Sequence, residues 1–302
     1  SIFEYDEEAV FEIVRKDEYE KGLQEGIKEG REEGFTAGKA DAKRDANLVA
    51  PEDVTAIYDV SYAGNEDSYN LLDVYYPKDT QGSLPVIVSV HGGGYVYGTK
   101  EIYKFYGMYL AQQGFTVVNF NYHLAPNAKF PTQLMETNMV LEWMVKHAEE
   151  YHMDLNNVFM VGDSAGAQMA SQYAAIVTNA DYAKLFPFTV PQAITIRALG
   201  LNCGMYVLTI VDKDGKVNKM NKALYGDYLG KEFDFSDERL DVLGHITASY
   251  PPTYVMTSYY DFLKENAKPM YDFLTDKGIA CVQKCYGTED KKYMAHVCHV
   301  NM

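Results

Sequence analysis

The segment Gly162-Asp163-Ser164-Ala165-Gly166 matches the pattern G-x-S-x-G, in which the serine can act as a nucleophile. A short apolar run, 158–161, precedes it, and a helix-like segment of small residues, 165–177, follows. The two glycines allow a strand and a helix to crowd together at a sharp turn. Such a turn presents the hydroxyl at a helix N-terminus, where the helix dipole favours a developing anion. This context favours a catalytic Ser164 over a serine that merely occupies a turn.

The segment His91-Gly92-Gly93-Gly94 follows a second apolar, β-branched run, 85–90. Three consecutive glycines destabilise a chain, so their presence suggests that the backbone must approach something closely. A loop of this kind can direct N–H groups at an oxyanion, as acyl-transfer enzymes require. The alternative is a flexible turn. We interpret His91 as a residue that braces the loop.

The elements that must position these residues alternate along the chain. Such alternation predicts an α/β fold with a mostly parallel, doubly wound sheet flanked by helices. Strands are expected at 71–76, 85–90, 115–120, 158–161, 197–206, 252–258 and 279–286, and helices at 102–112, 132–151 and 165–177.

Four motifs together resemble the α/β-hydrolases of the hormone-sensitive-lipase-like branch, which includes bacterial carboxylesterases and acetyl esterases. They are Leu72-Asp73-Val74-Tyr75 before a proline, HGGG at 91–94, Tyr122-His123-Leu124-Ala125-Pro126 followed by Phe130-Pro131, and GDSAG at 162–166. The resemblance covers about residues 55–300, and His123 stands where the family usually has arginine. It implies oxyanion donors at the N–H groups of Gly93, Gly94 and Ala165. It also implies a helical cap, supplied here by residues 1–54 and an insertion at about 207–248.

A nucleophilic serine needs a base, and the base needs an orienting carboxylate. In this fold the acid follows the serine along the chain and the histidine comes last. Asp261 follows the run 252–258, and its surroundings resemble the acid loop of the family, whereas Asp272 and Asp276 are better placed on the next helix. His296 and His299 compete for the base. We favour His296, which lies where the family carries its catalytic histidine.

These residues predict a serine carboxylesterase acting through an acyl-enzyme, with a short-chain, acetyl-like ester as the small-molecule substrate. Tyr95 and Tyr97 follow the glycine loop and are expected to wall the pocket. No cofactor and no metal are predicted. Two alternatives stay open at this point: a non-catalytic binding or scaffold protein on a hydrolase frame, and a peptidase.

Residues 1–45 differ from the rest of the chain, because they are charged and carry glycines at 22, 26, 30, 34 and 38. On a helix these positions form a slowly spiralling stripe of small residues, and each glycine weakens the helix. The segment can be a frayed tail, a docked cap helix or a contact between subunits, so we predict a possible homo-oligomer through residues 1–45. Residues 1–54 are accordingly separated from a catalytic domain at 55–302.

The remaining composition limits the partners. The formal net charge of −16 disfavours binding to nucleic acid. No apolar run reaches the roughly 18 residues of a membrane span, and the acidic N-terminus is unlike a signal peptide, so a cytoplasmic protein without membrane contact is expected. The four cysteines, Cys203, Cys281, Cys285 and Cys298, are expected to be free thiols. Asp212-Lys213-Asp214-Gly215 begins like a calcium loop but lacks its later ligands, so a turn is expected.

Overall fold

The computed structural model describes residues 48–211, 214–290 and 295–301. A single eight-stranded sheet runs through this part of the chain, in the order β1-β2-β4-β3-β5-β6-β7-β8. The pairs β1–β2 and β2–β4 are antiparallel and all other neighbours are parallel. The strands are β1 Val54–Ser61, β2 Leu71–Pro77, β3 Leu84–Val90, β4 Thr116–Phe120, β5 Met153–Asp163, β6 Ile196–Asn202, β7 Thr253–Ser258 and β8 Cys281–Tyr286. The predicted mostly parallel α/β sheet is confirmed.

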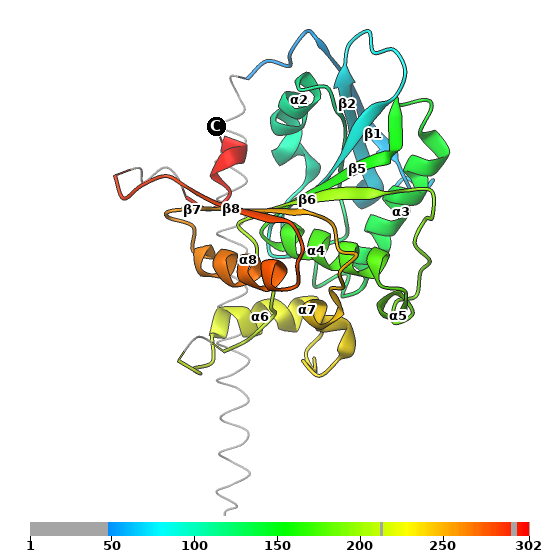
Figure 1. Cartoon of the computed structure of the whole chain (residues 1–302). Helices are drawn as coiled ribbons and strands as arrows, with labels where there is room; N and C mark the ends of the chain where they lie inside the picture. The colour runs from blue at the N-terminus through cyan, green and yellow to red at the C-terminus, as the bar shows by residue number, and fades with distance from the viewer. Residues whose placement is uncertain (1–47, 212–213, 291–294, 302) are drawn as a thin grey trace, which may run out of the picture.

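Helices cover both faces of the sheet (Figure 1). On one face α2, Lys104–Gln112, packs against β2 and β4 through Met108 and Ala111. The other face carries α3 (Thr132–His147), α4 (Ala165–Thr178) and α8 (Ala267–Asp276). Each of these helices buries side chains against the sheet. The small side chains of α4 let its axis lie close to β5 and β6, and nearly the whole helix is buried. The predicted cores of three helices and seven strands are therefore present, with altered ends.

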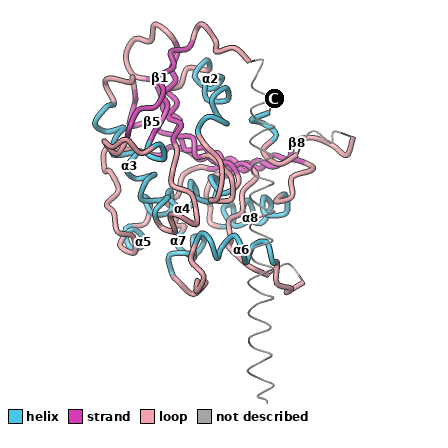
Figure 2. Tube along the Cα trace, turned by 180° about the vertical axis from the view of Figure 1, so that it is seen from behind, coloured by secondary structure: helices cyan, strands magenta, loops and turns pink. Residues whose placement is uncertain are grey.

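The predicted cap insertion lies between β6 and β7. It contains α6, Lys219–Tyr228, the short α7, Val242–His245, and a 3₁₀ turn at Glu238–Leu240. Both views show α6 and α7 beyond α4 and α8, farther from the sheet (Figures 1 and 2). Tyr228 joins this layer to the body, because its ring stacks on Tyr95 at 3.7 Å and its carbonyl accepts a hydrogen bond from the Phe130 N–H at 2.8 Å.

A buried lysine ties the antiparallel edge to the rest of the sheet. Lys100 lies in the 3₁₀ turn Lys100–Tyr103, and its ammonium group pairs with Asp59 at 2.8 Å, Asp73 at 2.7 Å and Glu101 at 2.9 Å. Burial lowers the pKa of Lys100, but the three carboxylates outweigh it and raise the pKa well above its ordinary value. The Asp73 of the LDVY motif is thus a structural counter-ion.

Two features of the described residues bear on the remaining expectations. None of the helices in the described ranges is long and apolar enough to cross a membrane. The glycine-striped segment 1–45, with its predicted oligomer contact, lies outside those ranges, as does the start of the Asp212 turn.

Candidate active site

Ser164 sits at the sharp turn between β5 and α4. It is the N-cap of α4, with φ 55° and ψ −115°, a conformation that side chains rarely adopt. Its N–H donates to the Asn202 carbonyl at 2.8 Å, and its own carbonyl accepts from the N–H groups of Ala167 and Gln168. The hydroxyl-bearing residue is therefore held in a strained turn by the end of β6 and by the first turn of α4.

The two glycines of the pentapeptide are required by close approach. A Cβ added at Gly162 would lie 2.2 Å from the Gly166 carbonyl oxygen, and one at Gly166 would lie 2.1 Å from the Val90 carbonyl oxygen. No side chain fits at such distances. The turn 162–166, called the elbow below, therefore packs closely against the end of β3, where the glycine loop begins.

Asp261 and His296 form a hydrogen-bonded pair in the segments that follow β7 and β8. Nδ1 of His296 lies 2.6 Å from Asp261 Oδ1. The carboxylate also accepts from the Thr257 hydroxyl at 2.6 Å and from the Leu263 N–H at 2.9 Å. Burial raises the pKa of Asp261, but these three hydrogen bonds outweigh it, so the pKa lies below its ordinary value. The acid therefore stays ionised and can stabilise a charged imidazole.

The two candidate bases have different partners. His299 does not reach Asp261 in this structure; its Nε2 lies 3.0 Å from Asp163 Oδ1, and its Nδ1 is buried with no hydrogen-bond partner among the described residues. His296 instead uses Nδ1 on Asp261, and its side chain is 20% exposed, with the Phe262 ring 4.2 Å from its own. Only His296 therefore keeps Nε2 free in a partly open position. Asp272, set aside as the acid on its sequence position, pairs with Lys268 on the exposed side of α8.

Two adjacent residues at the end of β6 contact two different segments of the site. One contacts Ser164, and the other contacts the residue after His296. Asn202 holds the Ser164 N–H, as described, and the next residue, Cys203, accepts from the Val297 N–H through its sulfur at 3.4 Å. One ligand atom each from Cys203, Asp261 and His296 lie within 4.8 Å of one another. Ser164 and the His296–Asp261 pair are thus gathered at the same edge of the sheet.

The glycine loop lies against the elbow. A Cβ at Gly92 would lie 3.3 Å from the Ser164 Cβ, and Gly93 and Gly94 both have positive φ, +112° and +56°. Within the described part of the chain, the N–H groups of Gly93, Gly94 and Ala165 donate to no other main-chain carbonyl. These three N–H groups, which the family resemblance implies as oxyanion donors, are thus not used by the main chain of the described part.

His91 braces this loop from inside the protein. Its ring is fully buried, stacks on Tyr122 at 4.0 Å, and lies with Nδ1 2.7 Å from the Gly92 carbonyl oxygen. Burial lowers the pKa of His91 to about 4, against a weaker opposing effect of the Gly92 carbonyl. The imidazole is therefore neutral and donates its Nδ1 proton to that carbonyl.

The two tyrosines expected to wall the pocket have different environments. Tyr95 is almost completely buried, with its ring on Tyr228 and its hydroxyl donating to Gln168 Oε1 at 3.0 Å. Tyr97 is 38% exposed. Leu224 of α6 also approaches the glycine loop, because its Cδ1 would be 3.4 Å from a Cβ at Gly94. A leucine within an insertion carries no sequence signal, so only the fold could reveal this contact.

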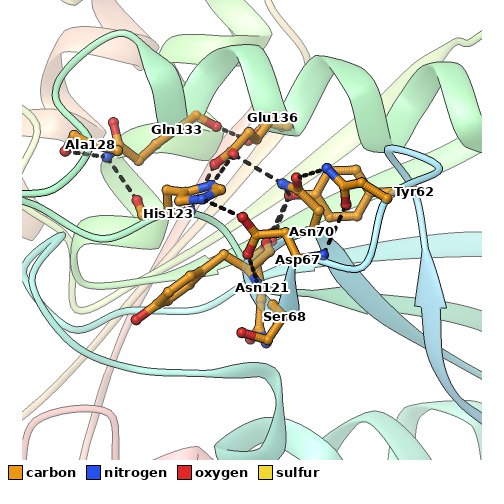
Figure 3. A network of polar contacts seen from close by, with 12 residues as sticks. Tyr62, Asp67, Ser68, Asn70, Asn121, His123, Ala128, Gln133 and Glu136 are labelled. Carbon is orange, nitrogen blue, oxygen red and sulfur yellow. Dashed lines mark hydrogen bonds and ion pairs between the residues drawn. The ribbon is translucent and has the colours of Figure 1, made fainter.

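A polar network fixes the loop that follows β4 (Figure 3). His123 lies between two carboxylates, with Nδ1 2.5 Å from Glu136 Oε1 and Nε2 3.1 Å from Asp67 Oδ2. Glu136 also accepts from the His123 N–H and from the Asn70 amide. Burial lowers the pKa of His123, but Glu136 and Asp67 outweigh it and the net pKa is raised. The two carboxylates therefore favour the protonated form of His123, and together the three side chains hold this loop in place.

The glycine loop, the elbow and the acid all lie within one known family domain. The family model named BD-FAE matches residues 72–267, which include all three. The chain belongs to the BD-FAE family. This membership and the sheet described above confirm the resemblance to α/β-hydrolases of the esterase type.

The chain is also similar to individual proteins of known name and to solved structures. An acetyl esterase of Salmonella schwarzengrund is 23% identical over 233 residues, 70% of this chain and 66% of that protein. A mimivirus α/β hydrolase is 39% identical over 101 residues, 33% of this chain and 29% of that one. The chain thus spans less than two thirds of these relatives. Among solved structures, esterase B of Lactobacillus rhamnosis has a TM-score of 0.82 at 22% identity, covering 92% and 89% of the two chains. An esterase of Pyrobaculum calidifontis has a TM-score of 0.68 at 21% identity, covering 91% and 87%. These similarities show a common fold.

Proposed function

We propose that this chain of the BD-FAE family is a serine carboxylesterase that hydrolyses short-chain, acetyl-like acyl esters. The observation that supports the proposal is the pair His296–Asp261, whose nitrogen and oxygen atoms lie 2.6 Å apart. This pair is at the same edge of the sheet as a strained serine and a loop whose N–H groups donate to no described main-chain carbonyl. A serine with only a structural role in a turn does not need this combination of features. An acyl-transfer enzyme needs all of them.

In the proposed reaction Nε2 of His296 takes the proton of the Ser164 hydroxyl as its oxygen attacks the ester carbonyl. The carbonyl π electrons move onto oxygen, and this anion is received by the N–H groups of Gly93, Gly94 and Ala165. Collapse of the tetrahedral intermediate breaks the bond to the alkoxy oxygen, which leaves as the alcohol with the proton from His296. Water, deprotonated by the same imidazole, then hydrolyses the acyl-enzyme and restores Ser164. Asp261 stays ionised throughout and holds the ring.

Two observations support a short acyl group. Leu224 lies over Gly94, so the space beside the oxyanion donors is limited by an aliphatic side chain of the cap. Among similar proteins, one is named an acetyl esterase, and esterase B of Lactobacillus rhamnosis has a crystal structure with a tributyrin phosphonate inhibitor. Acetyl and butyryl are both small acyl groups.

Hydrolysis of p-nitrophenyl acetate, butyrate and octanoate tests the proposal directly. We expect the wild type to prefer acetate or butyrate and Ser164→Ala to lose at least about 10³-fold in kcat. Ser171→Ala is the matched control, since it removes a buried hydroxyl from the same helix, where it contacts Tyr250 at 2.9 Å and not the elbow. Equal rates in the wild type and Ser164→Ala would refute the esterase and leave a binding protein on this fold.

A fluorophosphonate probe provides a second readout that needs no knowledge of the natural ester. It should label Ser164 in the wild type, and Asp261→Asn should slow this labelling, because the imidazole then loses its charged partner. Labelling at another residue would contradict the assignment of the nucleophile.

A further inference from the structure

The second histidine–aspartate pair lies directly beside the nucleophile and has no part in the proposed reaction. Asp163 precedes Ser164, is 1% exposed, and receives His299 Nε2 at 3.0 Å on Oδ1. The Asn202 amide donates to the same oxygen at 2.8 Å, while Oδ2 has no hydrogen-bond partner among the described residues. The Tyr103 side chain also interacts with this carboxylate, and removing a partner from a buried carboxylate is expected to be costly.

His299 has contacts on more than one side of its ring. Nε2 lies 3.0 Å from Asp163 Oδ1 and 3.2 Å from the Asn202 amide nitrogen, while Nδ1 is buried without a described partner. The ring also makes an edge contact with Tyr106, with 5.3 Å between the ring centres. His299, Asp163 and Asn202 therefore form one largely buried polar cluster.

This pair connects the two halves of the proposed catalytic centre. His299 lies three positions after His296, in the 3₁₀ turn Cys298–Asn301, and Asp163 lies one position before Ser164. Asn202 joins both, because its carbonyl holds the Ser164 N–H and its amide holds Asp163. The other described polar contacts that this segment makes with the rest of the protein run elsewhere: Ala295 to Ser258 at 2.6 Å, His296 to Asp261 at 2.6 Å, Val297 to Cys203 at 3.4 Å and His299 to the Asn202 amide nitrogen at 3.2 Å. Of the described contacts, His299–Asp163 is the one that links the His296 segment to the elbow itself.

We propose that Asp163 and His299 are positioning residues, a clamp that sets the distance between the Ser164 hydroxyl and the His296 imidazole. The clamp acts through the backbone on both sides and touches neither substrate nor reacting atoms. The inference rests on the proposed function, since it assigns a role in the same reaction. Small displacements of such groups are expected to reduce the chemical step much more than substrate binding.

Four variants test the clamp with p-nitrophenyl acetate. His299→Ala should lower kcat by at least about tenfold and leave KM within about twofold. His299→Gln, which keeps an amide donor, should recover part of that loss. The double variant Asp163→Asn/His299→Ala should regain thermal stability over His299→Ala, because no buried charge is left unpaired, yet keep the low kcat. His147→Gln is the control, since it breaks a histidine–glutamate pair of 2.8 Å at the C-terminal end of α3, where the His147 side chain is 37% exposed, and should leave kcat and KM unchanged.

The outcomes separate a positioning role from mere support. If the double variant regains both stability and kcat, or if His299→Ala keeps the wild-type kcat, the clamp is refuted. Amide hydrogen exchange of the peptide covering 295–301 gives a test without catalysis: exchange should rise at least about tenfold in His299→Ala, and an unchanged rate overturns the proposal. Failure of the esterase function shows up differently, as equal hydrolysis by the wild type and Ser164→Ala.

Discussion

Because His91 is buried and neutral, we expect the free energy of unfolding to fall in acid. Its pKa is lowered from 6.5 to about 4, chiefly because burial disfavours the charged imidazole. In the unfolded chain this histidine takes up a proton near pH 6.5, whereas the folded protein resists until about pH 4. The contribution of His91 is therefore fully present above pH 6.5 and is lost as the pH falls through that window. His91→Gln removes the titration, because an amide takes up no proton.

The magnitude follows from the width of the window. At about 1.36 kcal/mol for each pH unit, the folded state loses about 3 kcal/mol between pH 6.5 and pH 4. Carboxylates add their own acid sensitivity to both proteins, so the informative quantity is the difference between wild type and His91→Gln. That difference should be constant from pH 8 to 7 and should shrink by about 2–3 kcal/mol by pH 4.5.

Urea denaturation at a series of pH values measures this difference. The single tryptophan, Trp143, is buried on α3 and reports unfolding by its fluorescence. The slope of free energy against urea concentration must match between the two proteins at each pH for the comparison to hold. Parallel stability curves of wild type and His91→Gln from pH 6.5 to 4.5 would refute the idea that a neutral, fully buried imidazole braces the glycine loop.

Three further predictions concern the packing of the sheet and of the site, the second with a control substitution. Lys100→Met should lower the free energy of unfolding by about 3–5 kcal/mol, because the Asp73 carboxylate stays buried without its cation; a loss in urea denaturation below about 1 kcal/mol would contradict this. Gly166→Ala should destabilise by at least about 2 kcal/mol through overlap with the β3 carbonyl, whereas Gly226→Ala, which meets open space on α6, should stabilise by up to about 1 kcal/mol. Leu224→Ala should raise kcat/KM for p-nitrophenyl octanoate relative to acetate by roughly tenfold, and an unchanged ratio would place the acyl group elsewhere.

Much of the sheet was predictable because parallel strands buried on both faces are nearly continuous apolar runs. The runs before HGGG and GDSAG are of this kind, and the structure extends both, to Leu84–Val90 and Met153–Asp163. The edge strand Val54–Ser61 was not predicted. It is half-exposed, pairs antiparallel with a bulge, and shows no apolar run or strict alternation. Its stability comes from its neighbour β2 and from Lys100, contacts that a local pattern cannot show.

The residues at which helices and strands end are set by tertiary contacts, which the local sequence does not show. The helix expected over 132–151 ends at His147, because the chain then turns so that Met153 can pair with Leu84. The strand expected over 197–206 ends at Asn202, since Cys203 takes a φ of +49°. That early end is what leaves Asn202 and Cys203 available to the site. The proposed catalytic order Ser164, Asp261, His296 follows from motifs and from the family resemblance, whereas the contact between Asp163 and His299 joins residues far apart in the chain and has no local signal.

The two histidine–aspartate pairs show how the fold distinguishes groups of identical type. Asp261 accepts three hydrogen bonds, which hold its pKa below the ordinary value, so in the proposed reaction it would stabilise a positive charge on His296. His296 commits Nδ1 to that acid and leaves Nε2 free in a partly exposed ring. His299 commits Nε2 and has its second nitrogen buried without a described partner, so a proton arriving there has no acceptor to stabilise it. A base must accept a proton on an accessible nitrogen and then be stabilised in its charged form, and of these two histidines only His296 meets both conditions.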